Sequence, residues 1–427
     1  MLAKAETVAM IGTAGHPVQV EVHVAQGGIP TFKIVGLPTA SVREADQRIR
    51  SAIESLPKEK KYHWPSNRNV ANLAPGNLRK EGTHFDLVLA LCLLAGGRQI
   101  SAETLEGWMV VGELGLDGAI RPVRGVMAAA MTAKEHGRKG IICPADNAAE
   151  AAIVEGLKVV PVKSLLQAIE FLKDEWDPPE VEPAPEAPLI TEDMSEVKGH
   201  SEAKKAAEIA CAGGHNLLMI GPPGSGKSMI ASRLPGILPA MSFQESLDVT
   251  SVYSVAGLLG NKAGLMRRRP FRSPHQGVSL AGLIGGGSGL PRPGEVSLAH
   301  HGVLFLDEIS LFRSDALDSL RGPLEDGKVR IARSGATIEY PCSFSLVAAM
   351  NPCPCGYLGD TLRSCRCTGA RLRYYNEKLS GPLIDRFDIQ AMMARPTRAE
   401  LMSCEPAESS AAIRARVEGA REVQRER

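Results

Sequence analysis

The stretch Gly221-Pro222-Pro223-Gly224-Ser225-Gly226-Lys227-Ser228 decides the fold of the second half of this chain. An apolar run, residues 217–220, leads into it, and residues 229–234, which contain no strong helix breaker, lead out. Between a strand and a helix, such glycines let several backbone N–H groups point at one anion, and the helix adds its positive end. We expect Lys227 to reach the β- and γ-phosphates of ATP and the Ser228 hydroxyl to hold Mg²⁺. The alternative, a glycine-rich turn that binds nothing, does not account for these flanks.

A second element predicts hydrolysis. Residues 302–306 are continuously apolar, as a parallel strand buried on both faces must be, and they end in Asp307 and Glu308. We expect Asp307 to order the Mg²⁺ shell and Glu308 to polarise the attacking water. An Asp-Glu pair after a strand is otherwise a solvated loop, but a phosphate-binding loop earlier in the chain favours catalysis.

Size and composition describe an ordinary globular protein of two or three domains. The chain has 427 residues, 44% hydrophobic and 23% charged, with a net charge of +1. No apolar run reaches the ~18 residues that span a bilayer, and no secretion signal starts the chain, so we expect a cytoplasmic protein without a membrane partner. Nine cysteines in that setting predict reduced thiols or metal ligands. Nucleic acid would have to bind to local basic patches, because the chain as a whole is nearly neutral.

Alternating prolines and glutamates in residues 177–190 predict an extended linker after an N-terminal domain of residues 1–176. Within that domain, valines at every second position from 18 to 24 predict a half-buried strand. Residues 41–53 predict a helix that Ser41 starts, with Glu44 completing a capping box. Apolar triplets near residues 109, 141 and 159 predict further strands, so the domain is of the α/β or α+β class.

The segments 113–123 and 125–137 resemble the proteolytic domain of Lon-type proteases, an α+β fold of the ribosomal S5 domain 2-like type. That family hydrolyses peptides with a Ser–Lys dyad. The serine would fall near His84 and the lysine near Met127, and neither side chain can replace its counterpart. Thr83 is a possible substitute nucleophile without a lysine partner. The resemblance therefore implies a Lon-protease-like scaffold or protein-interaction domain that lacks the dyad.

Further features of the second half resemble AAA+ ATPases, and the resemblance implies an AAA+ core over residues 191–396. Residues 343–350 read as an apolar strand that ends in Asn351, which matches the polar sensor of that superfamily. Residues 380–388 resemble the arginine-finger segment of the branch that contains magnesium chelatase. By that resemblance, Arg386 would reach the γ-phosphate of a neighbouring subunit, and the protein would form a ring, most simply a homo-hexamer.

Four cysteines lie in a C-x-C, nine-residue gap, C-x-C arrangement: Cys353, Cys355, Cys365 and Cys367. Four thiolates can close a tetrahedral Zn²⁺ site and hold together a loop, about residues 353–367, that has no core of its own. The spacing departs from the usual C-x₂₋₄-C, so free thiols stay an alternative. The other five cysteines lie in apolar or unpatterned contexts and predict core thiols.

Taken together, the chain is identified as a member of the ComM/YifB-type magnesium-chelatase-like AAA+ ATPases. The matching stretches are residues 35–38, 272–275, 294–300 and 351–356. The resemblance implies an ATP-driven hexameric DNA motor, a branch-migration helicase of recombination or natural transformation that acts on single-stranded or branched DNA.

Basic residues suggest where DNA would bind. Residues 328–340 look like a β-hairpin that turns at Ser334-Gly335, with Lys328, Arg330 and Arg333 on or near its tip. In related helicases such a hairpin enters the ring pore, where cations meet backbone phosphates. A second candidate is formed by Arg267, Arg268, Arg269 and Arg272. The alternative for each cluster is a solvated charged surface.

The family continues past the finger into a helical lid. Residues 397–427 look like the start of that lid, largely missing from this chain, which we expect to weaken nucleotide binding or assembly. Besides a DNA motor, the residues leave open a chelatase-like ATPase that remodels a protein partner. An ATP-dependent protease is disfavoured by His84 and Met127, and a non-hydrolysing scaffold by Lys227, Asp307 and Glu308.

Overall fold

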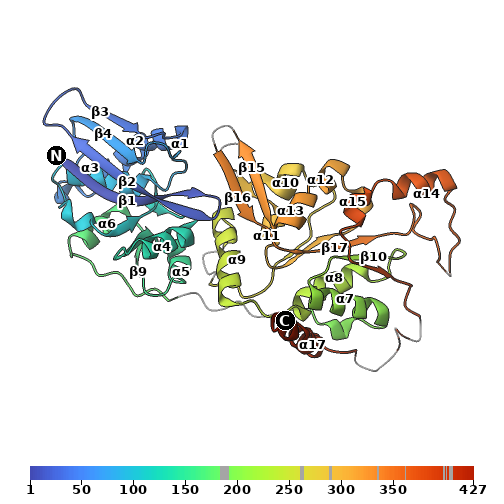
Figure 1. Cartoon of the computed structure of the whole chain (residues 1–427). Coiled ribbons are helices and arrows are strands. Elements are labelled where there is room, and N and C mark those ends of the chain that lie inside the picture. The colour runs from blue at the N-terminus through green and yellow to red at the C-terminus, as the bar shows by residue number, and fades with distance from the viewer. Residues whose placement is uncertain are drawn as a thin grey trace. The chain divides into compact units, whose positions relative to one another are not determined.

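The computed structural model describes residues 1–182, 192–259, 264–287, 291–333, 336–360, 362–397, 400, 402 and 407–427. The chain divides into two compact units (Figure 1): Met1–Ala187 with Thr250–Leu265, and Pro188–Val249 with Met266–Arg427. The first division falls within the predicted linker, of which residues 183–190 lie outside the described part. The pattern of the sequence did not predict that Thr250–Leu265 would join the first unit.

The first unit is built on a seven-stranded mixed sheet of order β3-β4-β2-β1-β5-β8-β9. Its strands are β1 (Leu2–Ile11), β2 (Ala14–Val24), β3 (Thr31–Val35), β4 (Arg68–Ala74), β5 (Trp108–Val110), β8 (Gly140–Pro144) and β9 (Lys158–Val162). Strand β2 pairs antiparallel with both β1 and β4. The other neighbouring strands pair parallel: β3 with β4, β1 with β5, β5 with β8, and β8 with β9. The strands predicted from the alternating valines and the three apolar triplets are confirmed.

Helices cover both faces of this sheet. Helices α2 (Ala45–Glu54), α3 (Asp86–Gly96) and α6 (Leu165–Leu172) lie on one face, and α4 (Val126–Glu135) and α5 (Ala148–Ala151) on the other. Successive strand residues alternate between these layers: Val110 and Ile142 pack with α3, Met109 and Ile141 with α4. Short elements complete the unit: α1 (Ala40–Arg43), η1 (Lys58–Lys60), η2 (Glu103–Leu105), β6 (Glu113–Leu114), β7 (Ile120–Arg121) and η3 (Ala145–Asn147).

The helix predicted over residues 41–53 is wrong in its start. Two helices, α1 and α2, replace it, and Glu44 lies between them without a side-chain cap on either. The Ser41 hydroxyl lies 3.0 Å from that of Thr39, and the Ser41 carbonyl accepts a hydrogen bond from Arg48 Nη2 at 3.0 Å. The two helices are separated by a turn at Glu44, and Arg48 of α2 is hydrogen-bonded back to α1.

The second unit contains a five-stranded sheet in which every pair is parallel, of order β11-β14-β17-β10-β18. The strands are β10 (Leu217–Ile220), β11 (Phe271–Arg272), β14 (Val303–Leu306), β17 (Ser345–Met350) and β18 (Ile389–Met392). The strands predicted before the phosphate-binding loop, before Asp307 and before Asn351 are therefore confirmed. They are neighbours in the sheet, so their carboxyl ends bring these residues to one edge.

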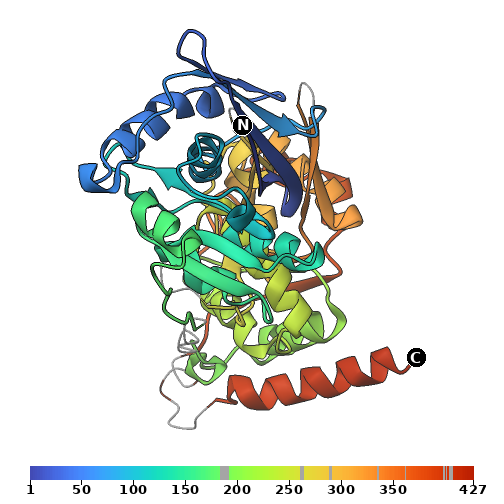
Figure 2. The same cartoon turned by 90° about the vertical axis from the view of Figure 1, so that its left-hand side faces the viewer.

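Both faces of this sheet are buried as well. Helices α7 (Ser201–Gly213), α8 (Lys227–Ile237) and α17 (Ser410–Arg425) cover one face, and α10 (Leu280–Ile284), α11 (Glu295–Leu298), α12 (Ser314–Asp318) and α15 (Gly381–Ile384) the other. Figure 2 shows α17 as one straight helix at the C-terminus, and Ser409 Oγ caps it by accepting from the Ala412 amide at 3.3 Å. The remaining elements are η4 (Met194–Glu196), α9 (Phe243–Ala256), β12 (Gly285–Gly286), β13 (Arg292–Pro293), η5 (Ile309–Leu311), α13 (Arg321–Asp326), β15 (Lys328–Arg333), β16 (Ala336–Pro341) and α14 (Gly369–Asn376).

The α/β architecture of the second unit, a parallel sheet between helical layers, agrees with a P-loop NTPase. The Lon-like arrangement of the first unit stays a prediction. In the described part of the chain, no helix has both the length and the apolar character needed to cross a bilayer.

Candidate nucleotide site

The phosphate-binding loop has the predicted strand–loop–helix setting. It follows β10 and ends where α8 begins at Lys227. Gly226 precedes that helix with a φ of 80°, a left-handed conformation that side chains other than glycine rarely adopt. The loop therefore turns directly into a helix N-terminus, where backbone N–H groups and the helix dipole attract an anion.

Lys227 is nearly buried and lies along the loop. Its Nζ donates to the carbonyls of Gly221 at 2.7 Å and Pro222 at 3.0 Å, and lies 3.4 Å from Asn351 Oδ1. Desolvation lowers the pKa of this ammonium group, while the carboxylates of Asp307 and Glu308 raise it. The lysine, the carboxylates and the amide of Asn351 therefore share one local environment, although they come from three different strands.

Oxygen ligands suited to Mg²⁺ meet at the same edge. Ser228 Oγ donates to Asp307 Oδ2 at 2.7 Å, and the other carboxylate oxygen of Asp307 accepts from the Glu308 amide at 2.9 Å. Mg²⁺ prefers hard oxygen ligands such as carboxylates and keeps several waters. The hydroxyl and carboxylate present here fit that ion, with further positions left to phosphate oxygens and water.

A cleft of about 780 Å³ opens over these residues. Residues 223–229, Asp307, Glu308 and Asn351 line it, which includes most of the residues predicted for the site; Gly221 and Pro222 are not among the lining residues. Residues 273–276 line it too, and no role had been assigned to them from the sequence. They follow β11, whose carboxyl end lies at the same sheet edge, so His275 and Gln276 add polar groups beside the phosphate-binding loop. In the sequence, only the family resemblance of residues 272–275 pointed to this segment.

Arg386 lies after α15, and its guanidinium forms an ion pair with the Glu325 carboxylate. Both side chains are more than two-fifths exposed. Among the described residues that line the cleft, Arg386 is absent. It is thus placed at the surface of the unit, and whether it serves a neighbouring subunit stays a prediction.

The four cysteines of the predicted zinc loop converge. Their ligand sulfurs all lie within 4.8 Å of one another, with Cys353 Sγ 3.3 Å from Cys355 Sγ and 3.7 Å from Cys365 Sγ. Sulfurs at the ~2.3 Å zinc–thiolate distance in a tetrahedron are about 3.8 Å apart. The four thiols therefore fit a Zn²⁺ ion. Cys92, Cys143, Cys211 and Cys342 are buried thiols, as expected, and Cys404 lies outside the described residues.

The predicted hairpin is present as β15 and β16, but its basic residues are not all at the tip. Lys328 pairs with Pro341 at the end away from the turn, and Arg330 is next along the same face. Both cations pair with Glu339, at 2.7 Å and 3.0 Å. The prediction placed Lys328 wrongly, because it is the first residue of a six-residue strand and so lies at the open end of the hairpin. The turn residues 334–335 and the side chain of Arg333 lie outside the described part.

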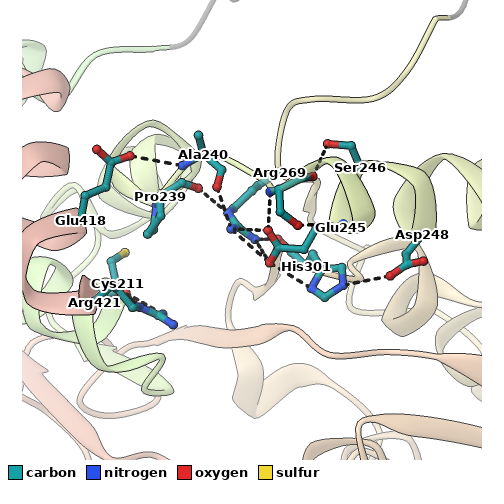
Figure 3. A network of polar contacts seen from close by, with 11 residues as sticks. Cys211, Pro239, Ala240, Glu245, Ser246, Asp248, Arg269, His301, Glu418 and Arg421 are labelled. Carbon is teal, nitrogen blue, oxygen red and sulfur yellow. Dashed lines mark hydrogen bonds and ion pairs between the residues drawn. The ribbon is translucent and has the colours of Figure 1, made fainter. Parts of the chain in front are cut away.

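Two residues of the second basic candidate already have partners within the fold. Figure 3 shows Arg269 enclosed in a polar network: it donates to the carbonyls of Pro239 at 2.6 Å and His301 at 2.7 Å and pairs with Glu245. Arg272 forms a two-pronged ion pair with Glu295, at 2.6 Å and 2.8 Å. These contacts hold Arg269 and Arg272 within the fold, and DNA contact by this cluster stays a prediction.

At the positions where the resemblance to Lon-type proteases would place the Ser–Lys dyad, the side chains are enclosed. His84 and Met127 are buried, and His84 Nε2 donates to the Val8 carbonyl at 2.8 Å. Burial lowers the pKa of His84 to about 4 and raises that of the neighbouring Asp86 to about 6. The Thr83 hydroxyl donates to the Glu113 carboxylate. Each of these polar groups already has an internal partner, and a scaffold role without peptidase chemistry stays a prediction.

The parallel sheet, the phosphate-binding loop and the Asp307 edge together define a P-loop NTPase. Comparison with known proteins then gives the family. Models for the magnesium chelatase subunit ChlI match residues 193–401 and residues 20–147. The chain belongs to the ComM/YifB-type magnesium-chelatase-like AAA+ ATPases, a family that binds ATP and Mg²⁺ and hydrolyses ATP.

Three relatives illustrate the membership. Rv2897c of Mycobacterium tuberculosis is 43% identical over 427 residues, which is 100% of this chain and 83% of that protein. YifB of Escherichia coli is 41% identical over 425 residues, 99% of this chain and 82% of that protein. Competence protein ComM of Haemophilus influenzae is 40% identical over 428 residues, 98% of this chain and 82% of that protein.

Proposed function

We propose that this chain is the subunit of an ATP-driven, ring-forming DNA motor, a branch-migration helicase of recombination or natural transformation. The observation that carries the proposal is the convergence of Lys227, Ser228, Asp307 and Asn351 on one cleft. The relative named for competence, in which DNA is taken up, supports DNA as the partner. Such a motor would work in the cytoplasm, where chromosomal DNA and ATP are both available.

In the proposed mechanism the loop amides and Lys227 bind the phosphates of ATP and neutralise their charge. Bound to Ser228 and Asp307, Mg²⁺ would supply further charge neutralisation at the β- and γ-phosphates. Glu308 accepts a proton from the attacking water and Asn351 orients that water, since both line the cleft beside the loop. Residues 273–276 close the cleft on the side of β11.

We propose that the four thiols hold structural zinc, because their separations match a tetrahedral thiolate site. When bound, Zn²⁺ would supply a crosslink between the two ends of the loop. The expected measurement is one zinc per chain by elemental analysis, lost in Cys365→Ser. A folded wild-type protein purified without metal that does not take up zinc would contradict it.

We further propose that subunits form a homo-hexamer in which Arg386 serves the cleft of the next subunit. Fingers of this kind contribute about 10³–10⁵ in rate. The test mixes two variants that are each inactive alone, Lys227→Ala and Arg386→Ala. In a mixed ring, an intact loop of one subunit meets an intact finger of the other, so part of the ATPase activity returns. A mixture as inactive as its components would place Arg386 in a role within its own subunit.

For DNA contact we propose the β15–β16 hairpin. Glu339 competes with DNA phosphates for Lys328 and Arg330 in the present pairing. Glu339→Gln is therefore expected to tighten binding of a single-stranded oligonucleotide several-fold, and Lys328→Ala with Arg330→Ala to weaken it and reduce its salt dependence. Unchanged affinity and salt slope in both variants would remove the hairpin from the DNA path.

The function itself is tested by ATP hydrolysis with no DNA, single-stranded DNA and a four-way junction, with Lys227→Ala as the blank. We expect stimulation by DNA, strongest for the junction, and ATP-dependent movement of the branch point. Hydrolysis that is indifferent to DNA would favour the chelatase-like alternative, in which the partner is a protein bound through the first unit.

A further inference from the structure

The cysteine loop is connected to the nucleotide site at both of its stems. Its first ligand, Cys353, is fully buried and follows Asn351 by two residues. Its last ligand, Cys367, leads directly into α14, which begins with the Thr368 hydroxyl accepting from the Arg371 amide. The loop therefore starts at the sensor residue and ends on a helix that lies beside it.

Helix α14 contacts the predicted sensor residue, Asn351, through the side chain of Tyr375. This side chain is 8% exposed, and its hydroxyl donates to the Asn351 carbonyl at 3.1 Å and accepts from Ser310 Oγ at 2.9 Å. Ser310 is two residues after Glu308. One buried hydroxyl thus ties together the segments that carry Asn351 and Glu308, the two residues proposed to handle the attacking water.

The middle of the loop rests on the phosphate-binding loop itself. Gly356 is buried, and a Cβ atom built at this position would lie 2.6 Å from Pro223 Cδ. Beyond it, Asp360 is fixed: its side chain is only 2% exposed and it pairs with Arg395 Nη2 at 3.2 Å. Arg395 follows β18, and its guanidinium also lies 5.8 Å from the centre of the Tyr357 ring.

We infer that the cysteine loop is a brace for the ATP site, with Gly356 positioning the phosphate-binding loop and Tyr375 positioning Asn351, and that metal binding by the four thiols keeps the brace in place. The inference rests on the proposed ATPase function and extends it. A loop without a hydrophobic core of its own keeps a defined shape only while its crosslink is intact. Loss of zinc is therefore expected to displace Pro223 and Asn351, the two residues of the ATP site that the brace contacts.

Gly356→Ala tests the contact with Pro223, and Gly359→Ala is its matched control. Both glycines have a positive φ, 85° and 77°, so alanine meets similar backbone strain at each. Only at Gly356 does the added Cβ collide with the phosphate-binding loop; at Gly359 nothing lies within 4 Å. We expect Gly356→Ala to weaken binding of a fluorescent ATP analogue about tenfold with zinc content unchanged, and Gly359→Ala to match wild type. Equal affinities in the two variants would overturn the inference.

Tyr375→Phe tests the second contact, and Tyr374→Phe, a neighbouring tyrosine that is 67% exposed, is its control. Loss of the Tyr375 hydroxyl is expected to lower kcat about tenfold with KM unchanged, because it positions Asn351 and does not touch the loop that binds phosphate. A purely structural tyrosine would change stability without this split between kcat and KM, and that result would remove Tyr375 from the brace.

Removal of zinc from the wild-type protein with a chelator completes the test. Chelation starts from the folded protein, whereas the Cys365→Ser substitution can itself prevent correct folding. We expect nucleotide affinity to fall with the zinc content and to return when Zn²⁺ is added back. Full affinity without zinc would contradict the brace. A wild-type protein that binds no nucleotide even with zinc, like the Lys227→Ala blank, would instead contradict the proposed ATPase function.

Discussion

The nucleotide cleft and the region around His84 and Asp86 differ in whether their ionisable side chains are accessible. In the cleft, Lys227, Asp307 and Glu308 face a volume of about 780 Å³. In the first unit, His84 and Asp86 are buried, and each is already paired with a backbone or side-chain partner. Chemical function requires polar groups that are held in place and still accessible to a substrate. Groups that are held but enclosed stabilise the fold.

The largest expected effect lies in the cleft. Glu308→Gln keeps the shape of the side chain and removes its basicity, so we expect ATP hydrolysis to fall by about 10²–10⁴-fold. Binding of a fluorescent ATP analogue is expected to persist in this variant and to be lost in Lys227→Ala, which separates binding from chemistry. Hydrolysis at the wild-type rate would assign the base to another residue of the cleft.

In the first unit, the largest effect should come from breaking the buried ion pair. Arg48 Nε and Nη2 donate to the two oxygens of Asp86 at 2.6 Å and 2.9 Å, and the Asp86 side chain is fully buried. Arg48→Met leaves that carboxyl without its partner, at an expected cost of about 3–5 kcal/mol at pH 8. All three tryptophans, Trp64, Trp108 and Trp176, belong to this unit, so tryptophan fluorescence during urea unfolding reports its stability.

The sign of the pH dependence checks this interpretation. Burial already raises the pKa of Asp86 to about 6, and without Arg48 protonation is easier still. The deficit of Arg48→Met should therefore shrink as the pH falls from 8 to 5, because a neutral carboxyl needs no cation. A deficit that does not change with pH would mean that lost packing, and not the charge, accounts for it.

The two regions also differ in how far the sequence could predict them. The phosphate-binding loop, Asp307 and Asn351 were readable because each follows an apolar strand, and parallel strands bring their ends to one edge. The place of His275 in the cleft was not readable, since it depends on a short strand, β11, of two residues. The anchoring of Arg269 depends on partners that only the tertiary fold brings close. The pairing of Lys328 and Arg330 with Glu339 follows from the hairpin that the sequence predicted, although the ion pair itself was not predicted from it.

For the same reason, the sequence did not predict that residues 250–265 belong to the first unit. The end of α9 belongs to the first unit, where Ser254 Oγ donates at 2.7 Å to the buried carboxylate of Glu150. No periodicity marks that change, because α9 has little amphipathic character along its length. Burial raises the pKa of the Glu150 carboxyl, whereas the hydrogen bond from Ser254 lowers it. These two residues are 104 positions apart in the sequence, so the contact could not be predicted from local pattern.

A smaller effect is expected from the pH response of His84. Its pKa of about 4 in the folded state lies below the usual value of 6.5, so the unfolded chain binds the proton more tightly. The contribution of His84 to the free energy of unfolding is therefore fully present above pH 6.5 and is lost as the pH falls toward 4. Between pH 7 and pH 5 the loss is about 2 kcal/mol. Asp86, with its raised pKa, opposes the trend over part of the same range.

The variant His84→Gln isolates this contribution, since glutamine can still donate to the Val8 carbonyl and does not titrate. Its free energy of unfolding is expected to decrease less than that of wild type between pH 7 and pH 5. If both proteins lose the same stability on acidification, His84 is accessible to protons in the folded state, and the contrast between an enclosed and an open site weakens.

The smallest expected effect concerns Thr83, which the sequence suggested as a possible substitute nucleophile in the first unit. The Thr83 hydroxyl donates to the carboxylate of Glu113, and no lysine occupies the position of Met127. Thr83→Val should therefore cost only about 1 kcal/mol of stability and leave ATP hydrolysis unchanged. A fluorophosphonate probe should label neither protein, because the Glu113 carboxylate that accepts from the Thr83 hydroxyl is a far weaker base than the lysine amine of the Lon dyad. Labelling of wild type that Thr83→Val abolishes would place an open, reactive site in the first unit and remove the contrast with the cleft.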